Sequence, residues 1–231
     1  MYSMKAERGR TMIEYTTIDL ATYPRKEHLE LFMGMQSPHA GVTAEVDVTD
    51  LKSFVKKEGC SFYLAFTHVA ALAADSIPQF RQRIHRLPSD GYEIREYAEC
   101  PTSGTESYGN DMYCYCNLNH HMCWKEYIEK ATVLQQQARK AGSLDEGEDS
   151  EALLYMTCVP WIHYADCMHP TDGVYDSNPR ISWGKFDEDY RGRLMMPLTV
   201  VVHHGLVDGI QLGQFYGNVQ KNMSALIEGR L

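Results

Sequence analysis

The sequence predicts an α/β fold in which helices pack on a mixed β-sheet. Two observations predict it. Some segments alternate apolar and polar residues, as half-buried strands do, whereas others repeat apolar residues three or four positions apart, as helices do. Both kinds of segment recur along a chain of 231 residues, 44% of them hydrophobic, which is long enough for one sizeable core.

The first expected helix lies in the segment ATYPRKEHLELF, with Thr22 as its N-cap and Pro24 in its first turn. Its apolar face consists of Leu29, Phe32 and Met33. In VTAEVDV, residues 42–48, apolar and polar residues alternate, which predicts a half-buried strand. Thr49 and Asp50 then open a short helix.

Further helices are expected in residues 62–77, in residues 121–140 and at the C-terminus, each with one apolar face. In the second of these, the apolar face comprises Trp124, Tyr127, Ile128, Ala131 and Leu134. The C-terminal helix is indicated by Leu212, Phe215, Val219, Met223 and Leu226. Strands are expected in residues 92–97, 111–118, 153–159, 180–186 and 194–202.

Charge and composition exclude several classes of protein. The formal net charge of −9 argues against nucleic acid or an anionic membrane surface as a partner. No apolar run reaches about 18 residues, and the N-terminus lacks the apolar core of a signal peptide, so a cytoplasmic protein is expected. Residues 1–14 are expected to form an N-terminal extension. Residues 15–231 are expected to form a single domain, because the acidic segment 142–151 is typical of a short solvated loop, and such a loop does not by itself divide domains.

The seven cysteines are expected to be free thiols, because no secretion signal is present. Cys114 and Cys116 lie two apart and His120 and His121 follow them. This spacing matches no zinc motif, and no second cluster of ligands stands at a defined distance in the sequence. No metal site is therefore predicted.

Two histidines, His203 and His204, end the apolar run 198–202, which is typical of a strand buried on both faces. Side chains alternate along a strand, so the two histidines point to opposite faces, and one of them can line a cavity. Asp208 follows at the start of the last helix, where a carboxylate can cap backbone N–H groups. Two interpretations stay open from the pattern alone: a catalytic histidine, or a buried histidine pair beside a capping aspartate.

The motif H-H-x-x-x-D-G resembles the signature of the chloramphenicol acetyltransferase family within the coenzyme-A-dependent acyltransferases. Other segments resemble that family in the same order along the chain: YTTIDLATYPRKEHLELF at residues 15–32, TCVPW at residues 157–161 and ISWGKF at residues 181–186. The resemblance covers about residues 15–226. It implies a two-layer sandwich in which helices pack on a mixed sheet, and an acetyl-CoA-dependent O-acetyltransferase that needs no metal cofactor.

The resemblance also implies roles for single residues. His204 is the general base, and the hydroxyl of Thr157, which stands where the family has serine, is the donor to the oxyanion. Asp208 forms a structural, buried ion pair with Arg25. The residues that match coenzyme-A contacts are Tyr63, Trp161 and Ser182.

The small-molecule acceptor is expected to be chloramphenicol or a similar alcohol. At the matching positions of the acceptor pocket, Cys167, His169 and Ser107 stand where the family has apolar residues, and polar walls favour a different hydroxylated acceptor. The alternative to an enzyme is a catalytically inactive or regulatory ligand-binding protein of the same fold.

The resemblance further implies a homotrimer whose active sites lie between subunits. Met112, Tyr113 and Tyr115 lie in an expected strand, and Tyr and Met are enriched at protein interfaces. The alternative is that these three side chains fill the core of a single chain.

Overall fold

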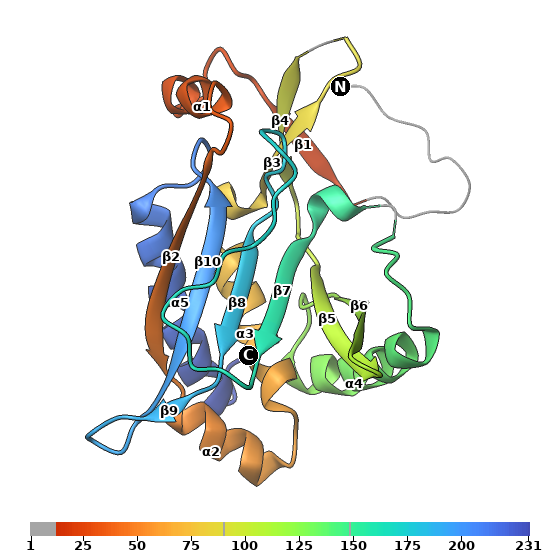
Figure 1. Cartoon of the computed structure of the whole chain (residues 1–231), viewed down its shortest axis with the longest axis vertical. Coiled ribbons are helices and arrows are strands. Elements are labelled where there is room, and N and C mark those ends of the chain that lie inside the picture. The colour runs from red at the N-terminus through yellow and green to blue at the C-terminus, as the bar shows by residue number, and fades with distance from the viewer. Residues whose placement is uncertain (1–12, 90, 148) are drawn as a thin grey trace.

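The computed structural model describes residues 13–89, 91–147 and 149–231, and Figure 1 shows its elements. The larger of two sheets runs in the order β2, β10, β8, β7, β5, β6, with β9 paired to β10. Its strands are β2 (His39–Asp47), β5 (Thr102–Gly109), β6 (Met112–Leu118), β7 (Leu154–Val159), β8 (Arg180–Gly184), β9 (Asp187–Glu188) and β10 (Leu194–His203). Strand β7 is parallel to β5 and β8, and the other pairings are antiparallel, so the predicted mixed sheet is confirmed.

The smaller sheet has the order β1, β4, β3 and is antiparallel. Its strands are β1 (Tyr15–Ile18), β3 (Gln82–Arg86) and β4 (Tyr92–Tyr97). Only β4 was expected from the sequence. Strand β3 contains Arg83, which is fully buried because its guanidinium donates to the carbonyl oxygens of Phe80, Glu151 and Leu153. A buried arginine satisfied by backbone carbonyls breaks the apolar alternation by which a strand is recognised.

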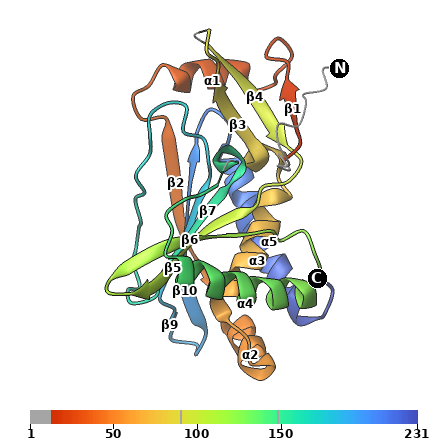
Figure 2. The same cartoon turned by 90° about the vertical axis from the view of Figure 1, so that its right-hand side faces the viewer.

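The helices are α1 (Lys26–Met33), α2 (Thr49–Glu58), α3 (Phe62–Asp75), α4 (Trp124–Ala141) and α5 (Gly209–Ile227), with short 3₁₀ turns at Pro78–Arg81 and Ser150–Ala152. Helices α3 and α5 cover one face of the large sheet, and the long connection 160–179 crosses the other, as the two views in Figures 1 and 2 show. None of the helices in the described ranges combines the length and hydrophobicity that crossing a membrane requires.

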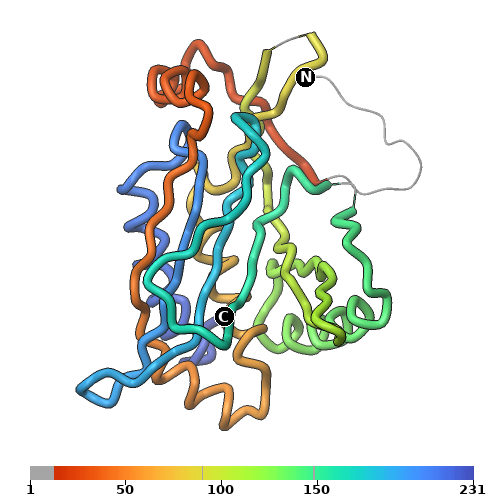
Figure 3. Tube along the Cα trace, viewed as in Figure 1, coloured from red at the N-terminus to blue at the C-terminus, as the bar shows by residue number. Residues whose placement is uncertain are grey.

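The core lies between α3, α5 and the large sheet. Helix α3 is apolar on nearly every side, as expected of a helix buried all round, and Ser61 caps its start by accepting the Leu64 N–H. Phe66 of α3 meets Trp183 of β8 edge-on with ring centroids 5.0 Å apart. The path of the chain from α3 across the sheet to α5 can be followed in Figure 3.

Two details of the predicted helices are wrong. Helix α1 begins at Lys26, not after Thr22, because Asp19 holds the preceding segment in a turn by accepting the backbone N–H of Ala21 (2.9 Å). Leu134, expected to point inward from α4, is 41% exposed. Its neighbour Gln135 is buried instead, because its side-chain amide donates to a carboxylate oxygen of Glu106.

All seven cysteines are free, as the sequence predicted. The predicted N-terminal extension falls almost entirely on residues 1–12, which lie outside the described residues, and the single-domain boundary at residue 15 stays a prediction.

Candidate active site

The side chain of His203 is packed in the protein interior. This residue ends β10, is 1% exposed, and its ring meets that of His39 at 5.6 Å. Its Nδ1 atom accepts the backbone N–H of Gly205 (3.1 Å), which holds the following turn. Burial lowers the pKa of His203 to about 4, so this imidazole is neutral near pH 7.

His204 is less buried, and its orientation is fixed by one hydrogen bond. Its Nδ1 atom lies 3.0 Å from the carbonyl oxygen of Val207. A carbonyl oxygen can only accept, so Nδ1 must carry the proton and donate. In the neutral ring the lone pair is then on Nε2, which is the form a general base requires. The ring of Phe32 lies against the imidazole, with centroids 4.3 Å apart.

Arg25 supports the turn that holds His204. Its guanidinium donates to the carbonyl oxygens of His204 (3.2 Å) and Gly205 (3.4 Å) and lies 3.7 Å from the Asp208 carboxylate. The predicted pair of Arg25 and Asp208 is thus present in geometry but is not a buried pair in the single chain. The Arg25 side chain is 16% exposed and that of Asp208 44%, because Asp208 stands at the open start of α5.

Asp208 caps α5. Its carboxylate accepts the Gly209 N–H (2.6 Å), and the side chain of Gln211 accepts the Asp208 N–H (3.0 Å), which completes a capping box. The Gly209 N–H lowers the pKa of the Asp208 carboxyl below its usual range, with a smaller contribution from Arg25. The cap therefore lowers the pKa of Asp208 more than the ion pair does.

We expect Asp208→Ala to lower the free energy of unfolding by about 1–2 kcal/mol, which is the usual contribution of an N-cap, and the melting temperature by about 2–8 °C. Asp208→Asn keeps a capping oxygen and should melt within about 2 °C of the parent. Thermal unfolding of the three proteins measures both effects. Equal losses in the two variants would show that the charge pair, not the cap, is what stabilises this turn.

A pocket of about 890 Å³ opens beside the other end of the sheet. Strands β5, β6 and β7 and the start of the 160–179 segment form its walls. Of the residues predicted for catalysis and for binding, those that line it are Thr157, Trp161, Ser107 and His169. The Thr157 hydroxyl is hydrogen-bonded to that of Thr105 across the β5–β7 pair (2.6 Å).

Ser182 is fully buried beneath the 160–179 segment. Its hydroxyl is 2.9 Å from Nε2 of His169, and the Cys167 sulfur lies 3.8 Å from the same nitrogen. Ser182 is the cross-strand partner of Thr157 on β7 and of Thr199 on β10. Thr199 is in turn the partner of Thr43 on β2, so the four residues form a row across the sheet. Hydroxyl residues thus lie level with one another across the sheet, on the face turned away from α3 and α5.

The two aromatic residues matched to coenzyme-A contacts differ in exposure. Trp161 is 78% exposed at the rim of the pocket. Tyr63 packs on Trp183, and its buried hydroxyl has no hydrogen-bond partner among the described residues. Tyr63 belongs to α3, on the opposite face of the large sheet from the pocket that Trp161 lines, so the structure does not bring these two residues together.

His204 and Thr157 are far apart within one chain. Thr157 is level with Thr199, two strands away, and His204 follows Thr199 along β10 by five residues. At about 4.8 Å between strands and about 3.3 Å per residue, their backbones are separated by roughly 15–20 Å. Neither side chain spans that distance. The His204 turn and the Thr157 pocket are therefore separate regions of one chain.

Sequence reasoning missed several polar residues of the pocket, among them Glu146, Tyr155 and Arg180. The Tyr155 hydroxyl donates to Glu146 (2.8 Å), and the Arg180 guanidinium lies over the Tyr155 ring (5.3 Å). Tyr155 and Arg180 are cross-strand partners in the parallel pair of β7 and β8. No local pattern in the sequence reveals which residues a parallel pairing brings together.

Comparison with known proteins gives consistent similarities. A family model described as chloramphenicol acetyltransferase matches residues 13–220. A chloramphenicol acetyltransferase from Escherichia coli is 24% identical over 227 residues, covering 90% of this chain and 93% of the relative. Among solved structures, a chloramphenicol acetyltransferase covers 92% of this chain and 100% of its own, with a TM-score of 0.76 and 23% identity. A probable dihydrolipoamide acetyltransferase from Listeria monocytogenes covers 95% and 97%, with a TM-score of 0.63 and 18% identity.

Proposed function

The chain belongs to the chloramphenicol acetyltransferase family and is an acyltransferase, and from this premise we propose that it transfers the acetyl group of acetyl-CoA to a hydroxyl of chloramphenicol or a similar small acceptor. The observation that carries the proposal is the hydrogen bond from His204 Nδ1 to the Val207 carbonyl. It leaves Nε2 able to take a proton from an alcohol.

In the proposed reaction, Nε2 of His204 removes the proton of the acceptor hydroxyl while that oxygen attacks the thioester carbonyl. The Thr157 hydroxyl donates to the oxyanion of the tetrahedral intermediate. The attack forms the new C–O bond; collapse of the intermediate then restores the carbonyl, breaks the C–S bond and releases coenzyme A, whose thiolate takes the proton back from His204. No further reactant is needed, because acyl group and proton are both exchanged.

The proposed site is shared between subunits of a homotrimer, with His204 from one chain facing the Thr157 pocket of its neighbour. The separation of the His204 turn and the Thr157 pocket within one chain supports this arrangement. Met112 and Tyr113 on edge strand β6 are also about half exposed in the single chain, as expected of residues that a neighbouring subunit covers in an oligomer. A cyclic trimer closes such a heterologous contact on itself.

The residues present fit acetyl-CoA as a co-substrate. The exposed Trp161 ring at the rim of the pocket offers an aromatic contact, whereas Tyr63 of α3 lies on the opposite face of the sheet and does not line that pocket. Ser182 is proposed to act with Trp161, although His169 covers it in the single chain. A cytoplasmic location, where acetyl-CoA is available and free thiols persist, is part of the proposal.

Ser107 and His169 make the pocket more polar than an aromatic drug requires, which supports a polar hydroxylated acceptor as the natural substrate. The test is a thiol-release assay with acetyl-CoA, in which chloramphenicol is compared with a panel of other alcohols. Acceptor-dependent release of thiol is expected. Acetyl-CoA binding without turnover on any acceptor would instead favour a catalytically inactive, ligand-binding protein of this fold.

Thr157→Val should lower the turnover number by about 10²–10³-fold, because valine keeps the shape of threonine but has no hydroxyl to donate to the oxyanion. Thr157→Ser keeps the donor and should stay within a few-fold of the parent. The turnover number in the thiol-release assay measures both. If valine supports normal turnover, Thr157 is not the oxyanion donor.

A further inference from the structure

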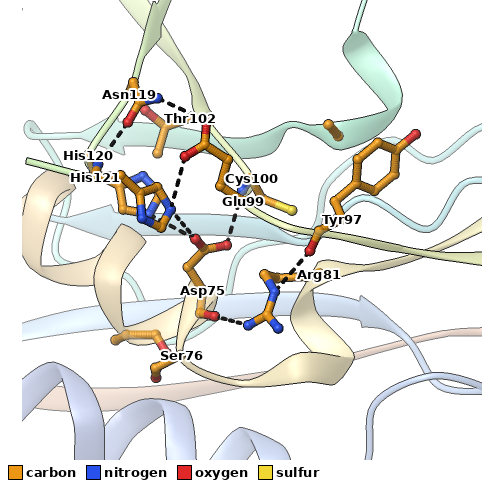
Figure 4. A network of polar contacts seen from close by, with 12 residues as sticks. Asp75, Ser76, Arg81, Tyr97, Glu99, Cys100, Thr102, Asn119, His120 and His121 are labelled. Carbon is orange, nitrogen blue, oxygen red and sulfur yellow. Dashed lines mark hydrogen bonds and ion pairs between the residues drawn. The ribbon is translucent and has the colours of Figure 1, made fainter. Parts of the chain in front are cut away.

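Three segments that are distant in the sequence bring a cluster of histidine and carboxylate groups together at the base of the β5–β6 hairpin (Figure 4). Asp75 is the last residue of α3, and His120 and His121 follow β6. One ligand atom from each of these three residues lies within 4.8 Å of the others. Glu99, from the connection between β4 and β5, stands beside them, with its Oε2 atom 3.9 Å from Nε2 of His121.

An ordinary ion pair does not explain why the imidazole of His120 is buried without a hydrogen-bond partner among the described residues. His120 is 1% exposed, and neither of its ring nitrogens has a hydrogen-bond partner among the described residues. Its Nε2 atom is nevertheless 3.3 Å from Oδ2 of Asp75, the same oxygen that Nε2 of His121 contacts. A hydrogen bond between His121 and Asp75 would satisfy those two groups and leave His120 orphaned. An unsatisfied buried polar group in a native protein indicates a missing partner, such as an ordered water or an ion.

The carboxylates are oriented as metal ligands usually are. The second oxygen of Asp75, Oδ1, accepts the backbone N–H of Cys100 (3.1 Å), which leaves Oδ2 turned toward the histidines. Glu99 has the same arrangement, because the Asn119 side chain donates to its Oε1 atom (3.2 Å). Hydrogen bonds that fix one carboxylate oxygen and free the other are characteristic of the outer shell of metal sites. Arg81 donates to the backbone carbonyl of Asp75, not to its carboxylate.

We propose that Asp75, His120 and His121 bind a divalent first-row transition ion, Zn²⁺ in the first instance, with the fourth position open to solvent. Two imidazoles and one carboxylate suit this class of ion. Ligand atoms around a tetrahedral zinc ion lie about 3.3 Å apart, and the distance from His120 Nε2 to Asp75 Oδ2 is 3.3 Å. The His121 and Glu99 side chains are each 36% exposed, so an ion can enter from the solvent side.

A metal ion at this site would stabilise the structure of the acceptor pocket and would take no part in the acyl-transfer reaction. It joins the end of α3 to the base of a hairpin whose opposite end, Gly109 to Met112, lines the pocket. The thiols are not part of it: the Cys100 sulfur faces Arg83, and Cys114 and Cys116 do not belong to the cluster. The sequence showed the two adjacent histidines but not Asp75, which lies 46 residues before His121.

The test uses the full chain without an affinity tag, stripped with a chelator and then equilibrated with Zn²⁺. One zinc ion per chain is expected by elemental analysis, and zinc at about 100 times its dissociation constant should raise the melting temperature by about 5–10 °C. His121→Ala removes a half-exposed ligand and should weaken zinc binding by about 100-fold or more and abolish the thermal shift. Cobalt should give the visible spectrum of a nitrogen and oxygen site without a thiolate band.

The matched control is His163→Ala. His163 also lies between two carboxylates, 3.1 Å from Glu45 and 3.8 Å from Asp187, but on the surface and outside the cluster. This variant should keep one zinc ion and the full thermal shift. A parent protein that binds no zinc, a His121→Ala protein that binds it as tightly as the parent, or a cobalt spectrum with a thiolate band would each overturn the proposed site.

Discussion

Replacing His204 by alanine lowers the turnover number by about 10²-fold or more and leaves the melting temperature close to that of the parent. The reason is local. The imidazole is held by the Val207 carbonyl so that Nε2 can accept a proton, and alanine removes that atom without disturbing β10. Turnover and thermal unfolding are measured on the same preparation.

The neighbouring histidine is the control. His203 is buried and accepts the Gly205 N–H, so His203→Ala leaves a buried donor unpaired and should mainly lower the melting temperature. The two adjacent variants are thus expected to separate turnover from stability. Near-normal turnover of the His204→Ala protein would exclude His204 as the base.

Co-expressing two inactive variants restores activity if the active site is shared between subunits. His204→Ala chains keep Thr157, and Thr157→Val chains keep His204, so a neighbouring pair of unlike chains rebuilds a complete site in one of its two orders. In a cyclic trimer assembled at random from equal amounts, about one quarter of the sites pair an intact His204 with an intact Thr157. Co-expressed variants should therefore show about one quarter of the parent activity.

The same experiment has a clear negative outcome. If each site lay within one chain, no chain among the co-expressed variants would have a complete site. Activity would then stay at the low level of the two single variants. Mixing the purified variants without subunit exchange serves as the control, because preformed trimers cannot rebuild sites. Light scattering should give about three times the 26.4 kDa mass of one chain. An active monomer would contradict the shared site.

The sequence predicted most of the large sheet, its main helices and the His204 turn because these depend on local signals, but it did not predict β5 or the short β9. Apolar periodicity marks α3, α5 and β10, and the end of an apolar strand marks the histidines. The exposure of Asp208 could not be predicted, because it depends on which distant segments pack beside the start of α5. Nor could the pairing of Tyr155 with Arg180, or of Asp75 with His120, because parallel strands and long-range contacts leave no local pattern.

The row of hydroxyl residues across the large sheet has a consequence for how this protein can evolve. The 160–179 segment is attached to that face largely by polar contacts, such as those of Tyr164 and His169 with Ser182, whereas the opposite face carries the apolar core. Each such hydrogen bond contributes only about 1 kcal/mol to stability, so exchanging residues in this segment endangers folding far less than core substitutions do. Selection can therefore reshape this wall of the pocket, by insertion, deletion or substitution, while the scaffold beneath it is inherited unchanged.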